Sequence, residues 1–200
     1  MQSADPSRTL FNLENAQILI VDGDPMSMSI MSQILAGFEA RHVTRCDAVE
    51  EAELKIRDQS FDLVILDPGT LGPGGYKFIH WLRRKSTAPN KFASVLIATG
   101  HCQSSRVSEA RDSGANFVLA KPLTPTAVFD RIMWMARERR PYVECKVYSG
   151  PDRRFREGGL PLGEPGRREE DKIDESLLTS ERELSQSDID AIMTPTRRAQ

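Results

Sequence analysis

In the stretch Val64-Ile65-Leu66-Asp67-Pro68-Gly69, an apolar run ends abruptly in a single carboxylate. The run begins at Phe61, and Pro and Gly residues follow the carboxylate at positions 68, 69 and 72–75. A short apolar run bounded by turn-forming residues predicts a buried strand of a parallel sheet. Asp67 would then lie at the carboxyl end of that strand, where open α/β sheets place their ligand sites. Taken alone, the stretch equally allows Asp67 to cap a turn.

Three other apolar runs also end in polar residues. Residues 18–21 are followed by Asp22, residues 94–98 by Thr99, and residues 117–120 by Lys121. The carboxyl ends of parallel strands point the same way, so these side chains and Asp67 are expected to converge. Two carboxylates, a hydroxyl and an ammonium group around one point make a place to bind a divalent cation and a phosphoryl group.

Apolar residues at helical spacing separate the predicted strands. The first helix starts with Asp24 as N-cap and Pro25 behind it, and a capping box at Asp47–Glu50 starts the second. The remaining elements are predicted as a short strand over 41–44 and helices over 75–84, over 104–112 and from Thr124 onward. The basic last turn of the 75–84 helix, at positions 83–85, suits the negative end of its dipole. This alternation predicts a doubly wound, five-stranded parallel sheet flanked by five helices.

The spacing of these residues resembles the receiver domain of two-component response regulators, the CheY-like form of the flavodoxin-like fold, over residues 17–140. The resemblance implies that Asp67 is the phosphoacceptor. It also implies a Mg²⁺ ion held by Asp67, Asp22 and the backbone carbonyl of Gly69. Thr99 and Lys121 match the family's hydroxyl and lysine that contact the phosphoryl group.

The chain departs from the family pattern at the metal site. Receivers carry two adjacent acids after the first strand, and the second, which touches the metal directly, is replaced here by Gly23. Asp24 is a doubtful substitute, because its place before Pro25 favours the N-cap role. We therefore expect weakened Mg²⁺ binding, which an aspartate at position 23 would tighten.

A second departure concerns the family's conformational switch. Its usual aromatic residue is replaced by Val118, and the neighbouring Phe117 faces the other side of the strand and is expected to pack in the core. Thr70 and Leu71 also make the loop after Asp67 unusual.

Two functions are compatible with these observations. The first is a stand-alone receiver, not an enzyme in its own right, that accepts a phosphoryl group from a histidine kinase or phosphotransferase and signals by protein contacts. The alternative is a pseudo-receiver adaptor that docks partners without phosphorylation, and the two departures from the family pattern favour it.

Composition and charge limit the cellular compartment and the kinds of partner that we expect for this protein. The net charge of −2 argues against DNA binding driven by charge, and no apolar run approaches the ~20 residues of a membrane span. The chain shows no signal peptide, and its three dispersed cysteines, Cys46, Cys102 and Cys145, look like free thiols of a reducing compartment. We therefore expect a cytoplasmic protein without DNA binding or membrane insertion.

The predicted organisation has four parts. Residues 1–15 form a flexible N-terminus, 16–140 the receiver domain, 141–183 a disordered linker rich in Pro, Gly, Arg and Glu, and 184–194 a short amphipathic helix. Within the linker, the Arg-rich turn of Arg153, Arg154 and Arg156 either binds an anion such as a nucleotide or is simply solvated.

The last helix has the form of a docking peptide. Leu184 can staple its start, and Ile189, Ile192 and Met193 form one apolar stripe. The stretch also resembles the N-terminal peptide of the flagellar motor switch protein, which binds the chemotaxis receiver. We expect this helix to dock on a receiver domain, its own or another, although a tail helix without a partner remains the alternative.

Overall fold

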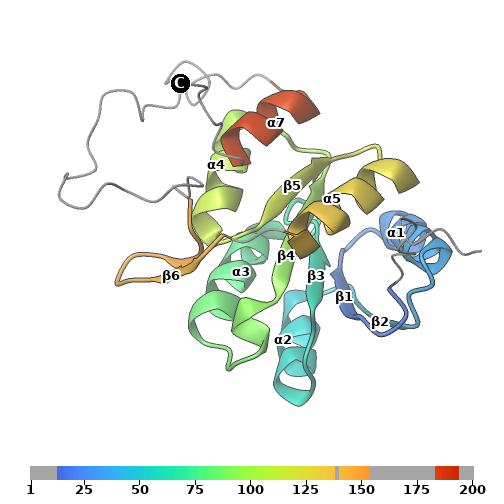
Figure 1. Cartoon of the computed structure of the whole chain (residues 1–200), viewed down its shortest axis with the longest axis horizontal. Coiled ribbons are helices and arrows are strands. Elements are labelled where there is room, and N and C mark those ends of the chain that lie inside the picture. The colour runs from blue at the N-terminus through green and yellow to red at the C-terminus, as the bar shows by residue number, and fades with distance from the viewer. Residues whose placement is uncertain (1–12, 138–139, 154–182, 194–200) are drawn as a thin grey trace, which may run out of the picture.

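A computed structural model describes residues 13–137, 140–153 and 183–193. Its main sheet has five parallel strands in the order β2-β1-β3-β4-β5 (Figure 1). The strands are β1 (Gln17–Val21), β2 (His42–Cys46), β3 (Leu63–Leu66), β4 (Ser94–Thr99) and β5 (Phe117–Ala120). The helices between them are α1 (Pro25–Gly37), α2 (Val49–Asp58), α3 (Gly75–Arg84), α4 (Ser104–Ser113) and α5 (Pro125–Arg137). The predicted doubly wound sheet is confirmed.

The helices cover both faces of the sheet. Helix α3 contacts both α2 and α4 on one side. On the other side α1 and α5 are neighbours, because the rings of Phe38 and Phe129 lie 5.3 Å apart (Figure 1). The central strands are therefore enclosed on both faces, which explains why their sequences are almost continuously apolar.

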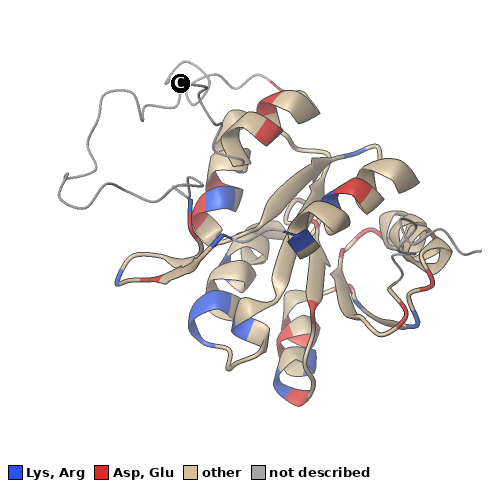
Figure 2. Ribbon diagram, viewed as in Figure 1, with Lys and Arg blue, Asp and Glu red and all other residues tan. Residues whose placement is uncertain are grey.

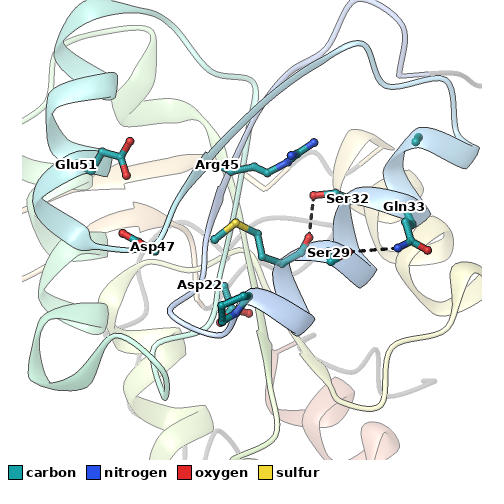
Figure 3. A pocket seen from close by; sticks show the side chains of 10 residues that line it. Asp22, Ser29, Ser32, Gln33, Arg45, Asp47 and Glu51 are labelled. Carbon is teal, nitrogen blue, oxygen red and sulfur yellow. Dashed lines mark hydrogen bonds between the residues drawn. The ribbon is translucent and has the colours of Figure 1, made fainter.

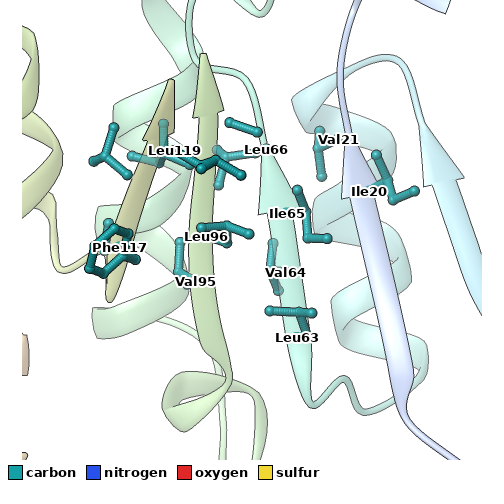
Figure 4. Close-up of a cluster of buried hydrophobic side chains, with 14 of the residues drawn as sticks. Ile20, Val21, Leu63, Val64, Ile65, Leu66, Val95, Leu96, Phe117 and Leu119 are labelled. Atoms are coloured by element: carbon teal, nitrogen blue, oxygen red, sulfur yellow. The ribbon is translucent and has the colours of Figure 1, made fainter. Parts of the chain in front are cut away.

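The core is concentrated on β1, β3, β4 and β5. Figure 4 shows their aliphatic side chains meeting in layers, and every residue of β3 is buried. Each fully buried Val, Leu or Ile contributes roughly 1.5–3 kcal/mol relative to exposure. A rigid core thus holds the polar residues at the strand ends in place.

The structure differs from the prediction after residue 140. The stretch expected to be disordered begins with an antiparallel hairpin of β6 (Tyr142–Glu144) and β7 (Ser149–Pro151). Tyr148 and Ser149 are buried, so the hairpin packs on the domain. The rest of the predicted linker, residues 154–182, and the N-terminal residues 1–12 lie outside the described residues, as do Arg154 and Arg156.

The backbone of Arg83 anchors the hairpin, because its carbonyl accepts hydrogen bonds from the Ser149 hydroxyl at 3.0 Å and from the Tyr142 hydroxyl at 3.4 Å. Positions 83–85 were predicted to form a basic last turn of α3, and the Arg83 side chain in that turn is only 1% exposed. Its guanidinium donates to the carbonyls of Gly114, Lys91 and Ala93 at 2.8–3.0 Å and to the Asn116 side chain at 2.9 Å. Burial lowers the pKa of Arg83 to about 10, so the group stays charged at neutral pH. It is a structural cation, and helix-dipole reasoning did not anticipate it.

The structure confirms the predicted N-cap of α1 and contradicts the capping box predicted for α2. Asp24 is the N-cap of α1, accepting a hydrogen bond from the Met26 amide at 3.0 Å, as predicted. The capping box at Asp47 does not form, because α2 begins at Val49 with Ala48 as an N-cap that makes no side-chain hydrogen bond.

The predicted tail helix is α7 (Gln186–Met193). It lies against β5 and α4 of the same chain, at the top of the view in Figure 1.

Candidate functional site

The ends of β1, β3 and β5 bring three predicted site residues into direct contact. The ammonium nitrogen of Lys121 lies 2.7 Å from Oδ2 of Asp67 and 3.2 Å from Oδ2 of Asp22. Both carboxylates are almost fully buried, whereas the lysine is about one-fifth exposed. The parallel sheet produces this cluster because each side chain follows the last residue of its strand.

Asp22 is surrounded by hydrogen-bond donors. Its Oδ1 accepts from the Asp24 amide at 2.9 Å and from the Thr70 hydroxyl at 2.8 Å. Its Oδ2 accepts from the Ser27 hydroxyl at 2.5 Å and from Lys121. Burial alone would raise the pKa of Asp22, but these donors and the lysine charge outweigh it and lower the pKa. Asp22 is thus a fixed anion.

Lys121 responds in the opposite direction. Burial alone would lower the pKa of its ammonium group, but the hydrogen bond and charge of Asp67, together with Asp22, raise it. The lysine therefore stays protonated beside Asp67, where it can neutralise an incoming anion.

Thr70 completes the site, and sequence reasoning noted it only as an unusual loop residue. Its hydroxyl donates to Asp22, lies 3.1 Å from the Asp67 carbonyl and accepts the amide of Gly23 at 2.9 Å. A Cβ atom on Gly23 would come within 2.6 Å of the Thr70 carbonyl oxygen. Glycine at position 23 and threonine at position 70 are therefore linked, because the loop after β3 fills the space that the side chain of a second acid would need. We no longer expect an aspartate at position 23 simply to restore a metal ligand.

Thr99 lies at the end of β4 and is buried. Its hydroxyl accepts the amide of His101 at 3.2 Å, so it is engaged with its own loop. A Cβ atom on Gly69 would meet Nδ1 of His101 at 2.8 Å and Oδ1 of Asp67 at 3.1 Å. The imidazole therefore lies beside the loop that follows Asp67. Nothing in the position of His101 along the sequence signals this contact.

The oxygen atoms available at the site determine how it could hold Mg²⁺. The ion prefers oxygen ligands and keeps several waters, so one or two carboxylates suffice when a phosphate adds oxygens. Each Asp67 oxygen accepts one protein hydrogen bond, from the Gly69 amide or from Lys121, and so keeps a lone pair free. Each oxygen of Asp22 already accepts two.

The residues present therefore fit a weak magnesium site. Asp67 and the Gly69 carbonyl would hold the ion. The negative charge of Asp22 would attract the ion without coordinating it directly. Asp24 serves as the helix cap instead. Within the described part of the chain, no group of three or more His, Cys, Asp or Glu side chains is placed to hold a metal.

An open cleft of about 570 Å³ leads to Asp22 from one side (Figure 3). Helix α1 contributes Ser29, Ser32 and Gln33 to its wall, and Arg45 and Glu51 face it from β2 and α2. Asp22 is the residue of the carboxylate–lysine cluster that lines this cleft.

Val118 and Phe117 are both buried in β5. The Phe117 ring packs edge-on against Trp134 at 5.1 Å, and the Arg131 guanidinium lies 4.5 Å from its centroid. Phe117 therefore packs in the core, as expected. The carbonyl of Val118 accepts a hydrogen bond from Gln186 of the tail helix at 3.1 Å.

No helix in the described ranges 13–137, 140–153 and 183–193 has the length and apolarity needed to cross a membrane.

Comparison with known proteins agrees with this geometry. The family model "Response regulator receiver domain" matches residues 18–133. A "Probable chemotaxis protein CheY" from Rhizobium etli is 32% identical over 112 residues, which are 56% of this chain and 84% of that protein. The virulence sensor protein BvgS of Bordetella pertussis is 28% identical over 133 residues, or 65% of this chain, but only 10% of the sensor is covered. The transcriptional regulatory protein YvrH of Bacillus subtilis is 26% identical over 60% of this chain and 48% of its own length.

Solved structures show the same fold. Chemotaxis response regulator CheY4 of Vibrio cholerae superposes with a TM-score of 0.53 at 24% identity, covering 59% of this chain and 96% of CheY4. A response regulator from Thermotoga maritima gives 0.54 at 17% identity, covering 62% and 98%. The chain spans half or less of YvrH and BvgS, so their whole-protein activities are not carried over. With its matched family model, its sheet order and its Asp22, Asp67 and Lys121 cluster, this chain belongs to the response regulator receiver domain family.

Proposed function

We propose that this protein is a receiver that accepts a phosphoryl group on Asp67 from a phosphohistidine of a histidine kinase or phosphotransferase. The observation that carries the proposal is the 2.7 Å contact between Asp67 and Lys121 at the carboxyl edge of the sheet. A buried carboxylate beside a cation, with Oδ1 oriented by the Gly69 amide, is a positioned nucleophile.

The proposed transfer is balanced. A carboxylate oxygen of Asp67 forms the new O–P bond while the N–P bond of the donor breaks, and its electron pair returns to the imidazole. Lys121 neutralises charge on the transferred group, and the amide of Gly69 keeps the carboxylate oriented. A bound Mg²⁺ would supply further positive charge opposite the phosphoryl oxygens.

The test is mass spectrometry of the full chain after incubation with acetyl phosphate and Mg²⁺. Wild type is expected to gain one phosphoryl mass, and Asp67→Asn none. Asp58→Asn, which alters an exposed aspartate at the end of α2, serves as control and should label like wild type. Equal labelling of Asp67→Asn and wild type would reject Asp67 as acceptor.

A pseudo-receiver adaptor is the second candidate. The saturated hydrogen bonding of Asp22 and the Gly23–Thr70 closure favour it, because both reduce the capacity for metal. Wild type that stays unlabelled even at high Mg²⁺ and with a phosphohistidine donor would decide for the adaptor. In either case we place the protein in the cytoplasm and its output in contacts with other proteins.

A further inference from the structure

Helix α7 lies on a surface formed by α4 and β5, which we call the α4–β5 surface. The apolar side chains that point into it are all at most 5% exposed, namely Leu184, Ile189, Ile192 and Met193. A helix of eight residues is unstable alone in water, because nucleation costs more than so few hydrogen bonds return. The α4–β5 surface therefore accounts for the helical form of this segment.

Gln186 ties the helix to the open edge of the sheet. Strand β5 is an edge strand, and such strands expose unpaired amide and carbonyl groups. The Gln186 side chain accepts from the Ala120 amide at 2.9 Å and donates to the Val118 carbonyl at 3.1 Å. One side-chain amide thus takes the place of a neighbouring strand, and an apolar residue at position 186 could not do this.

Charge fixes the orientation of the helix. Asp190 pairs with Arg131 of α5 at 2.5 Å, and its other oxygen accepts from Gln186 at 2.7 Å. At the other end, Arg140 donates to the Met193 carbonyl at 3.3 Å, next to the negative end of the helix dipole. Figure 2 shows that the charged residues on α7 are acidic.

The first residues of the tail segment, Glu183 and Leu184, form hydrogen bonds with the loop between β4 and α4. The Leu184 amide donates to the Cys102 carbonyl at 2.9 Å, and the Cys102 amide donates to the Glu183 carboxylate at 3.1 Å. The same loop holds the Thr99 hydroxyl through the His101 amide. The tail therefore contacts the loop after Thr99 and, through Gln186, the last residue before Lys121.

We propose that residues 183–193 are an intramolecular occupant of the α4–β5 surface, and that this occupancy and phosphorylation of Asp67 oppose each other. The proposal rests on the proposed function. A phosphoryl group on Asp67 brings new oxygens to Lys121 and Thr99, which in this structure are bound to Asp67, Asp22 and the His101 amide. The bonds of the tail to Cys102 and Ala120 fit the present positions of these groups, so rearranging them would strain the docked tail.

Coupling of this kind is reciprocal, so a docked tail also disfavours the phosphorylated state. Once released, the surface can take a helix of the same chemistry from another protein: an apolar stripe, a glutamine in the first turn and an aspartate four residues later.

The occupancy is tested with a fluorescent peptide copying residues 183–193, added to the full-length chain. A separate peptide must compete with the covalently attached helix, so wild type should bind it weakly. Ile189→Asp, which places a charge on a fully buried position of α7, should open the surface and tighten peptide binding at least tenfold. Gln186→Ala gives a second opening variant, which leaves the apolar core untouched. Unchanged peptide affinity in both folded variants would overturn the occupancy.

Exchanging the charges of the Arg131–Asp190 pair tests whether the peptide binds where α7 lies. In the opened chain, Arg131→Asp should abolish binding of the native peptide and restore it for a peptide carrying Asp190→Arg. Arg137→Glu, an exposed arginine on the same helix, is the matched control and should leave binding unchanged. A wild-type dimer that the opening variants abolish would assign the helix to a second copy and overturn the intramolecular form.

The opposition to phosphorylation is tested with acetyl phosphate and Mg²⁺. Wild type should gain peptide binding on treatment and Asp67→Asn should not, while Ile189→Asp should label several-fold faster than wild type. Labelling at equal rates with unchanged peptide binding would overturn the coupling and leave the proposed function intact. Absence of labelling in every variant would contradict the proposed function and the coupling together, while the peptide measurement still decides the occupancy.

Discussion

The hydroxyl of Thr70 lies 2.8 Å from Oδ1 of Asp22 and accepts the amide of Gly23 at 2.9 Å. One side chain thus joins the loop after β3 to the loop after β1, across the edge of the sheet where Asp67 lies. The contact requires the absence of a side chain at position 23, since a Cβ there would collide with the Thr70 carbonyl. Loss of the second acid and gain of the threonine bridge are therefore one structural feature.

Gly23→Ala should destabilise the domain by about 1–3 kcal/mol, because the added methyl forces the two loops apart. Gly37→Ala is the control, since nothing lies within 4 Å of a Cβ there and alanine favours the helix by about 0.5–1 kcal/mol. Urea unfolding measures both. Equal stability of Gly23→Ala and wild type would show that the loops separate freely and that the Gly23–Thr70 contact does not close the site.

Acid should weaken the contribution of Asp22. Its folded pKa lies below the ordinary value of 3.8, so this carboxylate stabilises the fold above about pH 3.8 and the contribution is lost as pH falls through the folded pKa. At neutral pH Asp22→Asn should cost roughly 1–3 kcal/mol, since buried donors lose a charged acceptor. The difference in unfolding free energy between wild type and Asp22→Asn should shrink between pH 6 and pH 3. A pH-independent difference would contradict the assigned shift.

Even the conservative substitution of Arg83 by lysine should lower the stability of the protein. A lysine ammonium cannot replace the planar fork that reaches four acceptors, so Arg83→Lys should cost about 2–4 kcal/mol and loosen the β6–β7 hairpin. Arg137→Lys, at an exposed position of α5, should change stability by no more than about 0.5 kcal/mol. Thermal unfolding compares the two variants. Similar midpoints would mean that the hairpin is held by other contacts.

Thiol reactivity should report the state of the tail. Burial raises the pKa of Cys46 and Cys102 to about 11, and Glu183 adds to the effect at Cys102. At pH 8 both thiols should react with iodoacetamide far more slowly than the exposed Cys145. Ile189→Asp should accelerate Cys102 and leave Cys46 unchanged, as peptide mapping can measure. Acceleration of both buried thiols would indicate general unfolding instead.

Local sequence patterns were sufficient for the fold and for part of the site. Apolar runs ending at Asp22, Asp67, Thr99 and Lys121 predicted the sheet, and a parallel sheet places strand ends at one edge whatever the rest of the chain does. The N-cap role of Asp24 and the buried stripe of α7 followed from spacing along a helix in the same way.

Contacts between distant segments were decided only by the tertiary structure. The hydrogen bond between Thr70 and Gly23 joins residues that are 47 positions apart in the sequence, and that between Arg83 and Asn116 joins residues 33 apart. Gln186 binds the edge of β5 at a residue 66 positions away. No periodicity records such pairs, because each depends on which loop or strand the fold brings alongside. The burial of Arg83 and the saturation of Asp22 arise for the same reason: hydrogen-bond partners of a buried group are supplied by whatever backbone surrounds it in space.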